Sequence, residues 1–256
     1  MSFFSYAPVD TSSPFRLEPF DVFHLAALAF LAGLGVLTAA FRRRLREDPA
    51  LERRVLRTAT IVAVGLEIAL HVCEFFSLPF HAFLRSLIPL ELCAITLWMA
   101  VTLTFARRPG LFEILYFWSI GALASLVFAN LDGAGPDRFR YYQYFGTHGY
   151  TILVVAYFAI VHGFRIRFRS LVKAVGILFP ITLALRFLNL AFEGPPWSLN
   201  YMYLLRPPEV ETPLEAFGEG WGYYAAFVIL AVALMALAWA PWGIARAIRA
   251  RKRSLP

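Results

Sequence analysis

Long apolar stretches alternate with short polar connections along the whole chain. Seven windows of about 20 mainly apolar residues are each long enough to cross ~30 Å of hydrocarbon as a helix. They lie at about 20–41, 58–77, 86–106, 111–131, 144–165, 170–192 and 221–245. The pattern predicts an all-α membrane protein in which residues 1–256 form one polytopic domain, a single bundle of seven transmembrane helices.

The basic residues predict how this bundle is oriented. Eighteen of the 24 lysines and arginines fall on one side, in the connections after the first, third and fifth windows and after the last. The other side carries few basic residues and most of the acidic ones, including Glu209 and Glu211. Because basic loops stay in the cytoplasm, we expect the amino terminus outside and the carboxyl terminus inside.

Composition agrees with a multi-pass integral membrane protein, which we expect in a bacterial cytoplasmic membrane. Hydrophobic residues make up 59% of the chain and charged residues 16%, against about 25% charged in soluble domains. The net charge of +7 is interpreted as topology and attraction to anionic lipids, so no nucleic-acid partner is expected. Cys73 and Cys93 both fall within apolar windows, so no disulfide is expected, and nothing predicts a signal peptide, a metal or a cofactor.

Polar residues inside the windows are the first candidates for function, because each costs free energy in hydrocarbon unless it is paired or faces a cavity. Glu67, His71 and Glu74 are spaced i, i+4, i+7 and therefore share one helical face. At ~1.5 Å per residue, several polar groups reach similar depths on the outer side. We therefore predict one pocket, open to the outside, on which six polar groups from four helices converge: His71, Glu74, Cys93, His148, Arg186 and Asn189. Glu67 lies deeper, near mid-membrane, and Glu91 lies in the same window as Cys93; both are expected to support the site.

Each of these residues also has a structural interpretation. A lone membrane cysteine is most often a small packing residue, and the Glu67 stripe is compatible with helix packing. Arg186 is compatible with snorkelling toward a membrane surface. His24 and His162 are interpreted as structural, because each lies near the end of a predicted span.

Four motifs in order carry a resemblance to a known family. They are Ile88–Cys93, Leu111–Trp118, Tyr141–Gly149 and Asn200–Pro208. In these segments the chain resembles the YwaF-like family of integral membrane proteins, which includes a vertebrate transmembrane acyltransferase of ether phospholipids. The sequence departs from that pattern at Glu91, where the family often has histidine, and at Ala129–Asn130, where it often has proline.

The resemblance implies an acyl-enzyme route through the cysteine of the first motif and the histidine of the third, here Cys93 and His148. A thiol in an apolar setting needs a base, and His148, oriented by Glu91 or Glu74, would supply it. The expected substrates are membrane phospholipids and lysophospholipids. Residues expected to bind the phosphate or the developing oxyanion, or to support the site, are Arg186, Asn189, Asn200 and Tyr201.

Other classes of membrane protein stay open at this stage. A retinal protein is excluded, because no lysine lies in the last window. A b-type haem protein would use a histidine pair such as His71 and His148. A proton-coupled transporter would use Glu67, His71 and Arg186, with a helix break predicted at Gly176–Pro180. A structural or sensory membrane protein is the remaining alternative.

Overall fold

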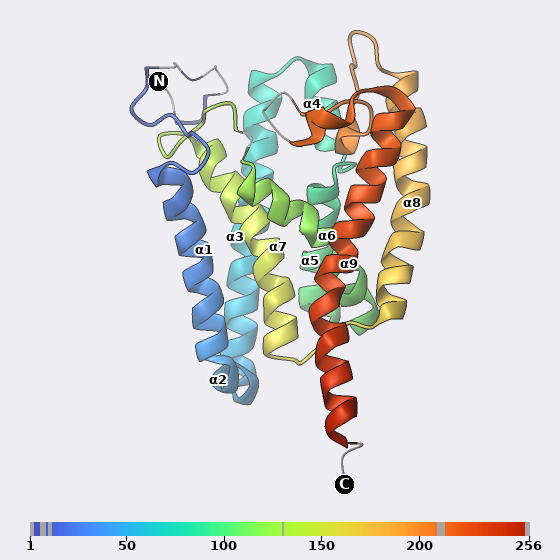
Figure 1. Ribbon diagram of the computed structural model, residues 1–256. Helices are drawn as coiled ribbons and strands as arrows, with labels where there is room; N and C mark the ends of the chain where they lie inside the picture. Colours follow the sequence, from blue (N-terminus) through green and yellow to red (C-terminus); the bar gives the residue numbers. More distant parts are fainter. Residues whose placement is uncertain (1–2, 6–8, 10–11, 130, 209–212, 254–256) are drawn as a thin grey trace. The chain divides into compact units, whose positions relative to one another are not determined.

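The computed structural model describes residues 3–5, 9, 12–129, 131–208 and 213–253. Asn130, Glu209 and Glu211 lie outside the described residues. Within these ranges every regular element is a helix (Figure 1). The α-helices are α1 Val22–Ala40, α2 Arg42–Glu47, α3 Pro49–Ser77, α4 Phe80–Leu87, α5 Leu92–Ala106, α6 Pro109–Val127, α7 Phe139–Ile160, α8 Phe168–Ala191 and α9 Gly220–Arg253; the 3-10 helices are η1 Tyr201–Tyr203 and η2 Pro213–Phe217.

The helices are those of a multi-pass membrane protein. By length and composition α1, α3, α6, α8 and α9 can each cross a membrane, and α4 with α5 passes the same test as one span bent by 47°. Five or six spans are thus supported among the described residues. The predicted number of seven needs α7 as well, which has the length of a span but a more polar sequence, and it stays a prediction.

Two boundaries differ from the expected windows for local reasons. Helix α3 begins at Pro49, well before the predicted start at 58, because Asp48 caps it: its Oδ1 accepts the N–H groups of Ala50 at 3.0 Å and Leu51 at 2.9 Å. The Leu51 N–H is the main cause that lowers the pKa of the Asp48 carboxyl. Helix α7 runs from 139 to 160 rather than 144 to 165, so Arg140 and Gln143 belong to the helix.

The third predicted span is interrupted. Helix α4 ends at Leu87 and α5 begins at Leu92. Between them the chain makes a tight turn, in which the Leu90 N–H donates to the Ile88 carbonyl at 2.8 Å. Pro89 disfavours helical backbone at Ile88 before it, which explains why the helix stops there. The break makes Glu91 the N-cap of α5 and puts Cys93 in its first turn.

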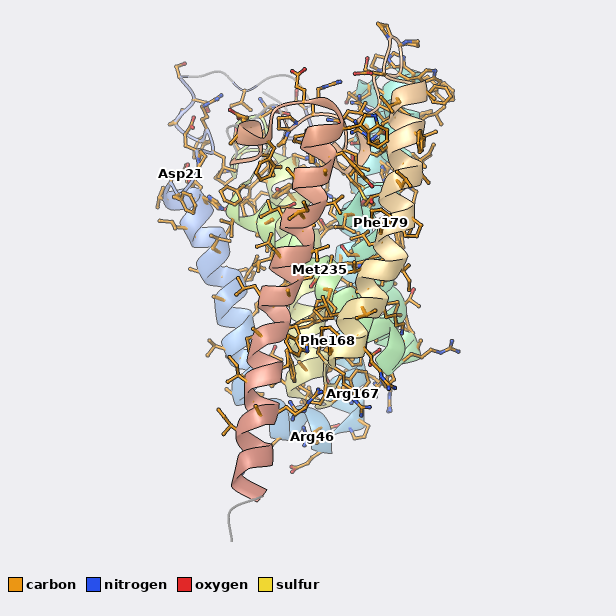
Figure 2. All side chains as sticks on the ribbon, turned by 45° about the vertical axis from the view of Figure 1, so that its right-hand side comes forward. Asp21, Arg46, Arg167, Phe168, Phe179 and Met235 are labelled. Carbon is orange, nitrogen blue, oxygen red and sulfur yellow. The ribbon has the colours of Figure 1, made fainter. Side chains whose placement is uncertain are left out.

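The chain divides into two compact units, and the division passes through α6. The first unit comprises Met1–Arg107 and Gly121–Gly163. In it α7 packs against α1, α3 and α5 (Figure 1). Gly146 and Gly149 make this possible, because their missing side chains leave room for Leu66 of α3 and Leu31 of α1. Asp21 and Arg46 mark opposite ends of the α1–α2 segment (Figure 2).

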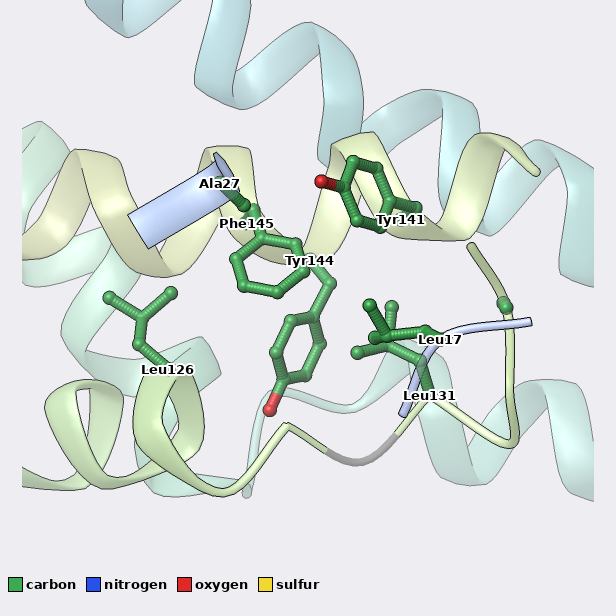
Figure 3. Close-up of a cluster of buried hydrophobic side chains, with 8 residues drawn as sticks. Leu17, Ala27, Leu126, Leu131, Tyr141, Tyr144 and Phe145 are labelled. Carbon is green, nitrogen blue, oxygen red and sulfur yellow. The ribbon is translucent and has the colours of Figure 1, made fainter. Parts of the chain in front are cut away.

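An apolar cluster fixes the first half of α7 within the first unit. Figure 3 shows its members, which are Leu17, Ala27, Leu126, Leu131, Ala134, Tyr141, Tyr144 and Phe145. The two tyrosine hydroxyls donate to main-chain carbonyls, Tyr141 to Phe23 and Tyr144 to Ser125, both at 2.7 Å. Helix α7 is therefore held in rotation as well as in position, so the face that it turns toward α3 and α5 is fixed.

The second unit comprises Arg108–Ile120 and Phe164–Pro256. Helices α8 and α9 pack along each other, with Phe168 of α8 stacked edge-on against Trp239 of α9 at 5.5 Å (Figure 2). The Trp118 indole N–H donates to the Ala174 carbonyl at 3.1 Å and ties the middle of α6 to α8. Helix α8 continues through Gly176 and Pro180, so the break predicted there is absent.

Candidate active site

A partly enclosed polar cavity of about 130 Å³ lies within the first unit. Its walls come from α3, α4, α5 and α7. Six of the residues predicted for the site line it, namely Glu67, His71, Glu74, Glu91, Cys93 and His148. The sequence had placed these on three separate windows, and the fold brings them around one space.

Cys93 reaches the cavity from the start of α5. The first hydrogen bond within this helix joins the Ile95 N–H to the Glu91 carbonyl at 3.0 Å. The N–H groups of the first turn are therefore left over by the helix, and the Glu91 side chain does not cap them. Cys93 is neither buried nor disulfide-bonded. Its thiol thus lies in the first turn of a helix and lines the cavity.

His148 lies in the wall formed by α7, with 9% of its surface exposed. Its Nδ1 is 2.8 Å from the Tyr144 carbonyl oxygen. Because a carbonyl only accepts, Nδ1 carries the hydrogen, and in the neutral ring Nε2 keeps its lone pair. No described residue bonds to Nε2. The main chain of α7 therefore holds the imidazole in the tautomer whose Nε2 can act as a base.

Glu67, His71 and Glu74, which share one face of α3 and are called the α3 stripe below, form polar contacts along the same cavity. His71 Nδ1 lies 3.0 Å from Glu74 Oε2, and His71 Nε2 lies 3.7 Å from Glu67 Oε1. Ser86 of α4 donates its hydroxyl to Glu74 Oε2 at 2.7 Å. The two imidazole nitrogens of His71 therefore face different carboxyl groups, Nδ1 that of Glu74 and Nε2 that of Glu67.

Gln143 of α7 extends these contacts across to Arg140. Its amide nitrogen donates to Glu67 Oε2 and its oxygen accepts from Arg140 Nη1, both at 2.7 Å. The side chain is buried, with 4% exposed. The amide thus links the Glu67 carboxyl group to the Arg140 guanidinium by hydrogen bonds, and the 3.7 Å contact between Glu67 and His71 connects this pair to the contacts of Glu74 and Ser86.

Sequence reasoning missed Ser86, Arg140, Gln143 and Thr147, which also line the cavity. Arg140, Gln143 and Thr147 are spaced i, i+3, i+7, which is the signal that identified the α3 stripe. It was overlooked because the fifth span was expected to begin at 144, which put Arg140 and Gln143 in a loop.

Four other predicted site residues belong to the second unit, where they fix the connection between α8 and α9. Asn189 pairs with the main chain of Tyr201 in both directions at 3.0 Å. Buried Arg186 donates to the Leu204 carbonyl, and its guanidinium lies 4.3 Å from the Trp221 ring centre. These contacts account for the burial of Asn189 and of part of the Arg186 guanidinium, whose Nε has no hydrogen-bond partner among the described residues.

Asn200 joins two parts of the connection between α8 and α9 by hydrogen bonds to its main chain. Its oxygen accepts the Leu205 N–H at 3.0 Å and its amide donates to the Arg206 carbonyl at 2.9 Å. A substrate-binding role for Arg186, Asn189, Asn200 and Tyr201 stays a prediction.

The two histidines interpreted as structural have such partners. His24 is fully buried, accepts the Phe20 N–H at Nδ1 and donates from Nε2 to the Leu126 carbonyl at 2.7 Å. His162 Nε2 lies 2.6 Å from Glu52, a buried carboxylate that the sequence reading did not single out.

Glu52 also accepts the Tyr157 hydroxyl at 3.0 Å and Arg107 Nη1 at 3.2 Å. It joins α3, α7 and the end of α5 at a point away from the cavity lining. In the described part of the chain, no group of three His, Cys, Asp or Glu side chains has the arrangement of a metal site.

No curated protein and no solved structure matches this chain. A family model does: that of the TMEM164 family matches residues 18–239. The matched stretch includes every helix from α1 to α8, most of α9, and all of the residues that line the cavity. Because it covers well over half of the 256 residues, the chain belongs to the TMEM164 family.

Proposed function

We propose that the protein is a phospholipid acyltransferase that works inside the membrane, with Cys93 as the nucleophile and His148 as the general base. One observation carries the proposal: the thiol and an imidazole with a free Nε2 line the same partly enclosed cavity. The resemblance of the two motifs to those of an acyltransferase-containing family supports the same pair, as an analogy of chemistry.

The reaction would proceed in two halves through a thioester. In the first, His148 Nε2 takes the thiol proton, and the sulfur attacks the ester carbonyl of a phospholipid. The tetrahedral oxyanion collapses, the carbon–oxygen bond breaks, and the departing lysophospholipid oxygen takes the proton from the imidazolium. In the second half, an acceptor lysophospholipid gives its hydroxyl proton to Nε2 and attacks the thioester. The carbon–sulfur bond then breaks, and the thiolate recovers the proton.

The size of the cavity limits which part of a lipid it accepts. Pockets that bury a whole small ligand enclose about 300–1,000 Å³, whereas this one encloses about 130 Å³. It suits the glycerol and ester region but not two acyl chains. The chains would lie along the apolar outside of α3 and α4, where Phe75, Phe76 and Phe80 are exposed.

The α3 stripe and its extension onto α7 would position this chemistry. Arg140 is the cation in the cavity wall and a candidate for contact with the lipid phosphate. Glu67, His71 and Glu74 form a polar network beside the thiol, and Glu91 occupies the N-cap position of the helix that carries it. Water would be scarce in such a site, which would favour transfer to a lysophospholipid over hydrolysis.

The proposed topology has seven spans, with the amino terminus outside and the carboxyl terminus in the cytoplasm. Helices α4 and α5 would form one bent span, and α7, at 22 residues, is about 33 Å long and would form another. The cavity would then open toward the outer leaflet. A reporter that is active only outside the cytoplasm should be inactive when fused after Pro256; activity there would overturn this orientation.

An acyl-transfer experiment tests the function directly. The purified protein is incubated with an alkyne-tagged phospholipid, and the label that hydroxylamine removes is quantified. We expect labelling in the wild type, none in Cys93→Ala, and normal labelling in Cys73→Ala, the matched control for the other thiol. Equal labelling of wild type and Cys93→Ala would refute the acyl-enzyme.

A proton-coupled carrier is the alternative that one observation favours. The succession of polar contacts from Arg140 through Glu67 and His71 to Ser86, in which Glu67 and His71 are 3.7 Å apart, resembles a proton relay. The continuous course of α8 counts against it, because carriers commonly bind their substrate at broken helices. Proton-dependent uptake into proteoliposomes that Glu67→Gln abolishes and Cys93→Ala leaves intact would establish the carrier instead.

A further inference from the structure

The break between α4 and α5 leaves main-chain donors in a place where the membrane would not tolerate them unused. Leu92, Cys93 and Ala94 form the first turn of α5, and the first bond within the helix uses the Ile95 N–H. The side chain of the N-cap, Glu91, does not cap the turn. Irregular backbone inside a membrane is tolerated where it lines a cavity, and Cys93 and Ala94 do line one.

The N–H groups of Cys93 and Ala94 belong to residues that line the same cavity as the reactive groups of the site. On the same cavity, His148 has 9% of its surface exposed and an Nε2 without a partner among the described residues. Because His148 lines the cavity, its Nε2 lone pair is available to a group that enters the cavity.

We infer that the N–H groups of Cys93 and Ala94 form the oxyanion hole of the reaction, an inference that rests on the proposed acyl transfer. When the Cys93 sulfur bonds to an ester carbonyl carbon, the carbonyl oxygen gains the electron pair of the double bond and becomes negative. A helix N-terminus places main-chain dipoles and a partial positive charge beside that oxygen. Donors fixed before the reaction need no reorganisation, which is why they stabilise the transition state.

The assignment also explains what the break between α4 and α5 contributes to the site. An unbroken helix through residues 80–106 would engage the N–H groups of Cys93 and Ala94 with carbonyls one turn earlier. The break at Pro89 leaves these two N–H groups without a hydrogen bond within the helix. The oxyanion hole therefore depends on backbone geometry and not on the side chains of Arg186 or Asn189.

Replacement of single peptide bonds by esters tests the inference, because it removes one N–H and keeps the side chain. Alanine 94 is replaced by lactic acid in the full-length protein through suppression of a stop codon. The matched control is the same amide-to-ester change at Leu92, whose N–H is also left over by the helix but which does not line the cavity. Neither change removes a hydrogen bond within the helix.

Two rates are measured on each protein, acylation by the alkyne-tagged phospholipid and alkylation of Cys93 by iodoacetamide, which forms no oxyanion. For the ester at 94 we expect acylation to fall about 10²- to 10³-fold, as for loss of one oxyanion donor. We expect alkylation to stay within about threefold of wild type, since its transition state needs no such donor. The control should resemble wild type in both.

The outcomes separate this inference from the proposed function. If the wild type acquires no label that depends on Cys93, the acyl transfer itself is wrong. If the wild type is labelled and the ester at 94 is labelled at the wild-type rate, the oxyanion hole is wrong while acyl transfer stands. If the ester at 94 fails to fold while the control folds, the N–H is structural, which also overturns the inference.

Discussion

Gln143 is the residue through which the polar network of the cavity can be tested most directly. Its amide links Glu67 to Arg140 through two hydrogen bonds of 2.7 Å and is 4% exposed. In Gln143→Leu, both bonds are lost while the volume is roughly kept. Hydrogen bonds to charged groups contribute about 1.5–3 kcal/mol each, but half-buried Arg140 regains water. We therefore expect a loss of roughly 2–4 kcal/mol.

For a chain of this size, 1 kcal/mol corresponds to about 2–4 °C in Tm, so thermal unfolding in detergent should shift down by roughly 4–16 °C. A double-mutant cycle with Glu67→Gln checks the cause. Much of the loss in Gln143→Leu comes from leaving the Glu67 carboxylate unpaired, so a neutral Gln at 67 should reduce it. We expect a coupling of about 1 kcal/mol or more. Additive losses, or a Tm shift below about 2 °C, would refute the bridging role.

Four further predictions concern the proposed base, the packing and the helix caps. In His148→Gln, the rate of acyl-enzyme formation should fall about 10²- to 10⁴-fold through loss of the base, with Tm nearly unchanged; a normal labelling rate would exclude His148 as the base. Glu52→Ala should lower the free energy of unfolding by about 1–3 kcal/mol because it leaves the buried Tyr157 hydroxyl unpaired, whereas the partly exposed Arg107 and His162 regain water, and a loss below about 0.5 kcal/mol in thermal unfolding would contradict this. Gly149→Val should destabilise by about 1–3 kcal/mol through collision with Leu31, and Leu31→Ala should restore part of the Tm; no rescue would argue against that contact. The pKa of Asp48 is lowered in the folded protein, so its contribution to stability is present above the usual value of 3.8 and is lost as the pH falls through the lowered pKa; the Tm difference between wild type and Asp48→Asn should shrink over that range, and a constant difference would contradict the cap.

Hydropathy locates the helices of this chain well and their interruptions poorly. Six of the seven windows correspond to a continuous helix, because about 20 apolar residues are enough to identify one. The window at 86–106 hides the α4–α5 break because averaging over a span conceals a four-residue turn. The local signal was present in Pro89, which restricts the residue before it.

The candidate site was predictable where a helical face could be read from spacing. Glu67, His71 and Glu74 share a face by their spacing alone, and the fold puts all three on the cavity. Arg186 and Asn189 were added on depth, and depth does not determine the side of a helix to which a residue points. Their side chains hold the connection between α8 and α9 in the second unit, and their role in the site stays a prediction.

Helix α7 and the break before α5 both place polar groups inside the part of the first unit that would lie in the membrane. Helix α7 carries Arg140, Gln143, Thr147 and His148 on one face, which hydrocarbon would reject. The break before α5 carries main-chain donors that hydrocarbon would also reject. Each becomes tolerable because both line the same cavity, so the break and the polar face of α7 depend on each other. A change that restores a continuous helix, such as Pro89→Ala, should therefore disturb the α7 face as well as Cys93, and altered iodoacetamide reactivity of Cys93 in that variant would reveal it.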